Sequence, residues 1–180
     1  MDNQPFKVLK KEEISEPNQQ LFDQLAKSYG AVPNLYATLA YSETALKAYM
    51  DLEATHLSLT DKEAEAVNLV VSEINHCLYC TSAHTMIARK AGFTKEQTLQ
   101  IRAGHAAFDP TLDALVQLTH ALTLHRSVHQ PALLDNFFKA GYTKGQLVDI
   151  ILLIGDRTIS NLLYEVTQVP VEFPLAEPLD

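Results

Sequence analysis

Apolar residues recur along most of the chain at intervals of three and four, the spacing that gathers them on one face of an α-helix. Capping boxes mark two helix starts, since a Thr at residue 60 or 94 is followed three residues later by Glu or Gln. Gly30, Gly92 and Gly141 mark helix ends. The pattern predicts an all-α fold of about eight helices, over residues 17–29, 33–57, 60–75 and 77–91, a short one opening at 94–97, then 110–122, 131–140 and 143–166.

A short internal repeat divides this helical pattern. Residues 90–97 (Lys-Ala-Gly-Phe-Thr-Lys-Glu-Gln) and 139–146 (Lys-Ala-Gly-Tyr-Thr-Lys-Gly-Gln) are identical at six of eight positions. The repeat is either a common helix–turn–helix solution or the trace of a duplication whose second copy has lost its cysteines. Both interpretations predict two weakly repeated helical halves in a single domain over residues 1–180. From residue 169 the chain has three prolines, and we expect an extended tail over 169–180.

Composition excludes several classes of function. With a net charge of −8 and no dense run of Lys or Arg, the chain is not expected to bind nucleic acid or an anionic membrane surface. Its longest strictly apolar run, residues 150–154, is far below the roughly 20 residues that span a bilayer. Residues 1–5 lack the start of a secretory signal. The two cysteines are too few for a disulfide scaffold, which favours a reducing, cytoplasmic location.

The cysteines themselves are the clearest candidates for chemistry. They form the sequence Cys77-Leu78-Tyr79-Cys80, with His84 four residues later. If Cys77 lies on a helix, Cys80 projects about 60° from it and His84 falls between the two. The N-terminus of a helix lowers the pKa of a thiol, and the thiolate is the form that attacks a peroxide or a disulfide. We expect His84 to exchange a proton with Cys80.

Other interpretations of these residues stay open on the sequence alone. The two cysteines with His84 and His76 are able to hold zinc, although a structural zinc site usually draws ligands from two separate clusters. A further alternative is a buried pair of cysteines that takes part in no chemistry. Glu65 lies nearly opposite the apolar face formed by residues 67, 70, 71 and 74, on a stripe with Ser72 and His76. By itself that stripe predicts a helix face in solvent.

The stretch over residues 60–92 resembles the core motif of the AhpD-like alkylhydroperoxidases, a group of the carboxymuconolactone decarboxylase superfamily. The family pattern is a Glu twelve residues before the first Cys, a small residue seven after that Glu, then C-x-x-C-x-x-x-H. Glu65, Ser72, the pair Cys77/Cys80 and His84 match it. The resemblance implies an all-α AhpD-like helical bundle, a homo-oligomer (trimer or hexamer), and chemistry that needs no metal or other cofactor.

The resemblance also implies roles for these residues. Cys80 is the attacking, peroxidatic thiol, Cys77 resolves the sulfenic acid into a disulfide, and Glu65 with His84 relays the proton through water. Tyr79 stands where the best-known members have His, and a tyrosine is a poor base near pH 7. Tyr is usual at this position in the peroxidase-related branch. With Ser72 and His76, Tyr79 is a candidate supporting residue. Decarboxylase members generally lack the C-x-x-C, so that activity is disfavoured.

We therefore expect a thiol-dependent peroxidase that reduces a hydroperoxide and is reduced by an external dithiol or thiol-redox protein. One alternative is a disulfide reductase or electron-transfer adaptor that serves another peroxidase through the same residues. Another is a redox sensor or stress-related binding module without turnover. Residues 147–154 are apolar almost all round a helix, which predicts burial within the subunit or in an interface between subunits.

Overall fold

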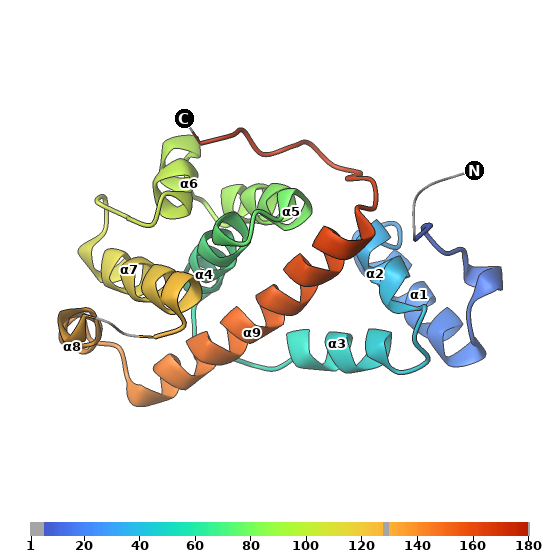
Figure 1. Ribbon diagram of the computed structural model, residues 1–180, viewed down its shortest axis with the longest axis horizontal. Coiled ribbons are helices and arrows are strands. Elements are labelled where there is room, and N and C mark those ends of the chain that lie inside the picture. The colour runs from blue at the N-terminus through green and yellow to red at the C-terminus, as the bar shows by residue number, and fades with distance from the viewer. Residues whose placement is uncertain (1–5, 128–129, 180) are drawn as a thin grey trace. The chain divides into compact units, whose positions relative to one another are not determined.

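The computed structural model describes residues 6–127 and 130–179. Residues 1–5, where the sequence predicts no leader, lie outside this part of the chain. The described residues form nine α-helices and one short 3-10 helix, and no strand occurs among them (Figure 1). The elements are η1 (Lys11–Glu13), α1 (Glu16–Tyr29), α2 (Asn34–Leu39), α3 (Ala45–Glu53), α4 (Asp61–Ile74), α5 (Leu78–Lys90), α6 (Lys95–Arg102), α7 (Pro110–His125), α8 (Pro131–Lys139) and α9 (Lys144–Thr167). The predicted all-α class is confirmed.

The count differs from eight because the helix predicted over 33–57 is two helices, α2 and α3. Hydrogen bonds with polar side chains mark the end of α2 and the start of α3. The Asn18 amide donates to the carbonyl oxygens of Ala40 and Ser42, at 3.4 and 3.0 Å, so these carbonyls do not continue a helical ladder. Ser42 Oγ accepts from the backbone N–H of Ala45 at 3.2 Å and caps the start of α3. A single helix over this segment is therefore wrong.

The chain divides into two compact units. One comprises the described residues up to His56 together with Leu162–Glu172, and the other comprises Leu57–Asn161 together with the residues from Phe173 onward. In the first unit, apolar side chains of α1, α2, α3 and the preceding segment form a small core, made of Leu9, Ile14, Phe22, Leu25, Ala37, Ala40 and Leu46. The candidate chemistry lies wholly in the second unit.

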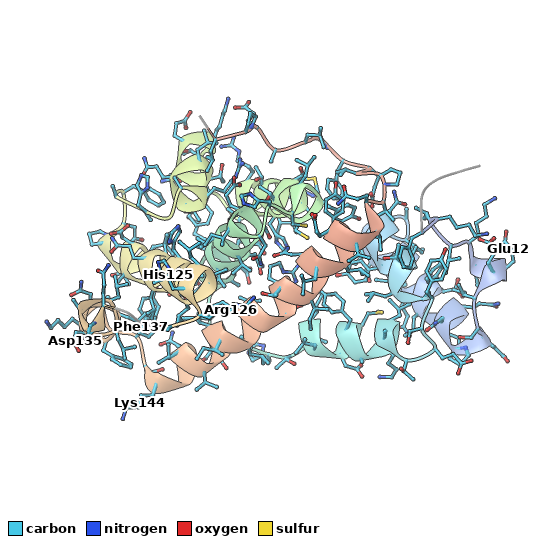
Figure 2. All side chains as sticks on the ribbon, in the orientation of Figure 1. Glu12, His125, Arg126, Asp135, Phe137 and Lys144 are labelled. Carbon is cyan, nitrogen blue, oxygen red and sulfur yellow. The ribbon has the colours of Figure 1, made fainter. Side chains whose placement is uncertain are left out.

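Helix α4 is the centre of the second unit. It contacts α5, α6 and α7, and Figure 1 shows it between α5 and α7. Eight consecutive residues, 65–72, are buried, so the predicted division into an apolar face and a solvent face is wrong. Neighbouring helices cover α4 on all sides, and its polar residues Glu65, Asn68 and Ser72 face the interior with the valines. At the far end of the unit, Phe137 of α8 (labelled in Figure 2) is fully buried and stacks on Tyr142.

Both copies of the sequence repeat form the same local structure, and both lie in the second unit. Gly92 and Gly141 adopt left-handed backbone angles, with φ of 97° and 102°. Thr94 then caps α6 and Thr143 caps α9, each by accepting from the backbone N–H three residues later at 3.2 and 3.1 Å. The repeated sequence is therefore a repeated helix end followed by a capped restart.

The residues after Thr167 are non-helical up to residue 179. From Phe173 this segment lies along α5 (Figure 1), where the backbone N–H of Ala176 donates to Ser82 Oγ at 2.9 Å. Glu177 pairs with Lys95 of α6 at 2.7 Å. No helix in the described part of the chain has the length and hydropathy required to cross a bilayer.

Candidate active site

The turn between α4 and α5 positions the two sulfurs. His76 has a left-handed backbone, with φ of 55°, and Cys77 is the extended residue that caps α5. Its backbone N–H donates to the Ser72 carbonyl at 3.0 Å. Its sulfur accepts from the backbone N–H of Cys80 at 3.2 Å, the contact that a Ser or Asp usually makes at a helix start. The prediction that Cys77 lies within the helix is therefore wrong, and its side chain instead folds over the first turn towards Cys80.

The two thiols are buried but differ in acidity. Cys77 is 1% exposed and Cys80 is 2% exposed. A hydrogen bond from the Cys77 thiol lowers the pKa of Cys80, burial opposes it, and the positive charge of Arg157 lowers it further. The hydrogen bond with Cys80 and burial together raise the pKa of Cys77. Cys80 is thus the sulfur that these surroundings favour as a thiolate.

Three further buried side chains, from α4, α5 and α9, form a row. His84 Nδ1 lies 2.8 Å from Glu65 Oε2, and its Nε2 lies 2.8 Å from Nη1 of Arg157. Because a guanidinium only donates hydrogen bonds, Nε2 must accept, which places the ring proton on Nδ1. His84 is therefore a neutral imidazole between Glu65 and Arg157.

Glu65 is held as a carboxylate in this row. Burial raises its pKa, but its pairing with His84, a hydrogen bond from the Asn68 amide at 3.0 Å, and the charge of Arg157 lower it by more. The net effect is a pKa below the ordinary value for a glutamate. The carboxylate and the guanidinium at the two ends fix both the orientation and the tautomer of His84.

Helix α9 contributes a second group of polar residues that the sequence-based interpretation missed. Arg157, Ser160 and Asn161 recur at intervals of three and four on one face, and all three are buried. The Ser160 hydroxyl lies 3.8 Å from the Cys80 sulfur. The signal in the sequence is the charged and polar group Asp156, Arg157, Ser160 and Asn161, which interrupts an otherwise apolar helix at helical spacing.

The structure brings together four of the seven residues named from the sequence, namely Cys77, Cys80, Glu65 and His84. The solvent-exposed alternative for Glu65 is wrong, because Glu65 is buried and contacts His84 directly. Both ring nitrogens of His84 are occupied by Glu65 and Arg157, so His84 makes no hydrogen bond to the Cys80 sulfur in this arrangement.

The three supporting candidates have different positions. Ser72 is buried and receives the Cys77 N–H on its backbone carbonyl. Tyr79 is buried and stacks edge-on against Phe173, with ring centroids 4.8 Å apart. His76 is exposed and lies outside the site. Among the described residues there is no group of three or more His, Cys, Asp or Glu side chains arranged to hold a metal ion.

The sequence profile of the Carboxymuconolactone decarboxylase family matches residues 40–124, a range that contains the cysteine pair, Glu65 and His84. Residues 40–124 are therefore similar to this family. A related sequence is the uncharacterized protein YdfG of Bacillus subtilis (strain 168), which is 29% identical over 124 residues. That match covers 65% of this chain and 84% of YdfG.

Solved structures with the same fold extend over almost the whole chain. A peroxidase-related protein of Ralstonia eutropha JMP134 with an alkylhydroperoxidase AhpD core has a TM-score of 0.82 at 20% identity, covering 96% of this chain and 94% of its own. A peroxidase-related protein of Silicibacter sp. TM1040 has a TM-score of 0.79 at 19% identity, covering 97% and 93%. The debrominase Bmp8, in complex with 2,3,4-tribromopyrrole, has a TM-score of 0.76 at 14% identity, covering 95% and 93%. The chain therefore has the AhpD-like helical fold.

Proposed function

We propose that the protein is a thiol-dependent peroxidase that reduces hydroperoxides through a dithiol–disulfide cycle of Cys77 and Cys80. The observation that carries the proposal is the difference between the two sulfurs. Cys80 lies in buried surroundings that favour its thiolate, and Cys77 is a protonated neighbour whose sulfur folds towards it. A thiolate beside a second thiol is the arrangement that a two-electron reduction requires.

The proposed cycle has two half-reactions. The Cys80 thiolate attacks the terminal oxygen of the hydroperoxide, the O–O bond breaks, and the departing oxygen takes a proton and leaves as an alcohol or water. Cys80 then carries a sulfenic acid. The Cys77 sulfur attacks the Cys80 sulfur, the S–O bond breaks, and the hydroxide leaves as water with the proton that Cys77 loses, which closes the disulfide.

We assign Glu65 and His84 to the transfer of the proton that the Cys80 thiol releases. His84 lies one helical turn along α5 from Cys80 and is neutral, which is the protonation state that a base needs. Since Arg157 occupies Nε2, the transfer requires that this hydrogen bond opens or that water bridges the sulfur and the ring. Glu65 stabilises the imidazolium that forms.

An external dithiol or a thiol-redox protein must reopen the disulfide by exchange, because the chain has no further cysteine to do so. Such donors are maintained in reducing compartments, and two cysteines used as a redox pair fit that setting. We propose a cytoplasmic location on this ground.

The decisive experiment is a paired turnover assay. One arm measures the loss of hydrogen peroxide and of an organic hydroperoxide with dithiothreitol, and the other measures exchange with a small disulfide. We expect the wild type to consume peroxide, Cys80→Ser to be inactive, and His76→Asn, an exposed control outside the site, to retain activity. Disulfide exchange without peroxide loss would support the electron-transfer adaptor instead. A single oxidation without turnover would support the redox sensor.

A second candidate substrate comes from the fold shared with a debrominase. A dithiol can also reduce a carbon–bromine bond: the thiolate takes the bromine, the carbon takes a proton, and the second thiol displaces bromide as the disulfide closes. The same assay with 2,3,4-tribromopyrrole as a third acceptor tests this. Release of bromide that depends on Cys80, without peroxide loss, would favour dehalogenation over peroxide reduction.

A further inference from the structure

Asn161 is a buried polar residue of the site, and the cycle proposed above gives it no role. It lies on α9 next to Ser160, whose hydroxyl is 3.8 Å from the Cys80 sulfur. Its side-chain oxygen accepts a hydrogen bond from the Asn75 amide at 2.9 Å. Asn75 caps the end of α4, two residues before Cys77. Asn161 is therefore held between the residues that flank the two sulfurs.

The orientation of the Asn161 amide follows from its bond to Asn75. Because Asn75 donates to Oδ1, the NH2 group of Asn161 points the other way. Asn161 is 2% exposed, and its Nδ2 has no hydrogen-bond acceptor among the residues that the structure describes. A buried donor without an acceptor costs free energy, so its presence calls for an explanation.

A sulfur that becomes ionised is the acceptor that this amide lacks. Asn161 follows the serine that lies 3.8 Å from the Cys80 sulfur, and it is bonded to Asn75, two residues before Cys77, so its buried amide lies beside both buried sulfurs. In keeping with this position, the amide lowers the pKa of Cys77 and of Cys80. A thiol is a weak acceptor and a thiolate is a strong one, so the hydrogen bond strengthens when either sulfur becomes ionised. A donor that gains an acceptor only in the charged state stabilises that state selectively.

We propose that the Asn161 amide is a hydrogen-bond donor shared by the two sulfurs, serving Cys80 while it is the attacking thiolate and Cys77 while it resolves the sulfenic acid. The second role matters because Cys77 must lose its proton in buried surroundings to close the disulfide. Once Cys80 has reacted, its sulfur no longer carries the negative charge, and the amide is free to serve Cys77. The roles of the two sulfurs rest on the proposed function, whereas the shared donor does not require that the acceptor is a peroxide.

The other charged or titratable groups of the site must be held constant in any test. These are Glu65 on α4, His84 on α5, and Asp156 and Arg157 on α9, with Asp156 Oδ2 3.2 Å from Nη2 of Arg157. Asn161 is uncharged and makes no hydrogen bond to any of them among the described contacts. Replacing it therefore changes the donor to the sulfurs without removing a charge from the site.

The test uses two parent proteins, Cys77→Ser to observe Cys80 and Cys80→Ser to observe Cys77. The rate of alkylation by iodoacetamide is measured against pH in each parent and after adding Asn161→Leu, which has a similar volume and no donor. We expect the midpoint of both pH profiles to move to higher pH, because each thiolate loses a hydrogen bond. The Cys80 thiolate fraction below its pKa should fall about tenfold or more, the size expected for a lost hydrogen bond to a charged group. Thr158→Val, which removes a hydroxyl that donates to the Ile154 carbonyl of the same helix, is the matched control and should move neither profile.

Asn161→Asp is the second variant. It keeps an oxygen that accepts from Asn75, replaces the donor by an oxygen and adds a negative charge, so both profiles should move to higher pH by more than in Asn161→Leu. Circular dichroism and thermal melting check that each variant folds. If Asn161→Leu and Asn161→Asp leave both profiles in place, Asn161 is not a donor to the sulfurs. A shift of Cys80 alone would overturn the shared role. Because peroxide is absent from these measurements, a protein without peroxidase activity would leave their outcome unchanged.

Discussion

At the scale of single residues, the main finding is that two cysteines three positions apart have opposite tendencies to ionise. Cys77 is a helix cap whose sulfur contacts the backbone N–H of Cys80, and Cys80 lies in the first turn near Arg157. A helix N-terminus alone would favour Cys77, the nearer of the two to the end of the helix. The hydrogen bond between the thiols and the guanidinium charge reverse that order.

This difference predicts which sulfur attacks. After one equivalent of peroxide, Cys77→Ser should accumulate a sulfenic acid on Cys80, because no resolving thiol is present. Cys80→Ser should react slowly or not at all, since burial raises the pKa of Cys77 even when the Cys80 thiol is absent. A sulfenic-acid trapping reagent followed by peptide mass spectrometry measures both. Equal rates of adduct formation in the two variants would show that the roles are assigned wrongly.

Arg157 offers a second test of the same difference. Arg157→Met should raise the pKa of Cys80, and the alkylation rate at a pH well below that pKa should fall about tenfold for each unit by which the pKa rises. Arg157→Lys keeps the charge but loses the planar fork that reaches both His84 and Asp156, so the pKa of Cys80 should rise less. The pH profile of alkylation distinguishes the two. If Arg157→Met leaves the Cys80 profile in place, the charge of Arg157 does not favour the Cys80 thiolate.

Glu65 predicts how stability depends on pH. Its pKa in the folded protein is lowered, so the carboxylate stabilises the fold above roughly pH 4.3, the unfolded value, and this stabilisation is lost as pH falls through the lower folded value. Glu65→Gln should remove this dependence and also slow oxidation of Cys80. Urea unfolding between pH 3 and 7 measures the first effect, with the exposed Glu43→Gln as control. If the free energy of unfolding depends on pH in Glu65→Gln as it does in the wild type, the partners of Glu65 do not stabilise its carboxylate.

At the scale of helices, the features that depend on nearby residues were predicted correctly, and those that depend on distant contacts were not. Capping residues act within four positions, so Thr60, Thr94 and Gly92 mark the ends of helices as the sequence indicates. The break between α2 and α3 depends on Asn18, more than twenty residues away. Hydrophobic periodicity cannot reveal such a contact, nor that neighbouring helices would cover the polar side of α4.

The candidate site shows the same limit. The residues on α4 and α5 belong to one stretch and match a family pattern, so they were found. Arg157 lies 73 positions from the histidine that it contacts, on a helix whose apolar residues dominate the pattern. The sequence contains two adjacent charged residues at 156 and 157 within an apolar helix, but only the fold shows that they are buried and that Arg157 contacts the site.

The two capping boxes allow a test at this scale. Thr60→Ala and Thr94→Ala should each lower the free energy of unfolding by about 1 kcal/mol. A loss of this size lowers the melting temperature by about 2–4 °C in a chain of this size. Helix α4 carries Glu65, whereas α6 carries no residue of the site. Calorimetry should give similar losses of stability, and peroxide turnover at 25 °C should be retained in both. A loss of turnover in Thr60→Ala alone, at equal stability, would mean that the start of α4 positions Glu65.

At the scale of the whole molecule, α9 shows an exposed apolar face that the subunit does not cover. Val148, Ile151, Leu152 and Ile159 are 65%, 53%, 40% and 46% exposed. Gly155 lies on the same face. Apart from its chain neighbours and the backbone of its own helix, no atom of the described residues is within 4 Å of the position that a Cβ there would take. A glycine inside a helix costs up to about 1 kcal/mol relative to alanine. The subunit's own packing gives no reason for it, whereas the close approach of a second helix would.

We propose that this face of α9 joins copies of the chain in a homo-oligomer, as the resemblance to the AhpD-like group implies. Light scattering at micromolar concentration should give a mass of three or six times 20.0 kDa. Ile151→Glu places a charge in the middle of the face and should shift the protein to a smaller species, since an unpaired charge is costly in an apolar interface. Leu124→Glu, the same kind of change at a residue of α7 that is 52% exposed, should leave the mass unchanged. A wild-type monomer, or equal masses for the wild type and Ile151→Glu, would show that this face does not join subunits.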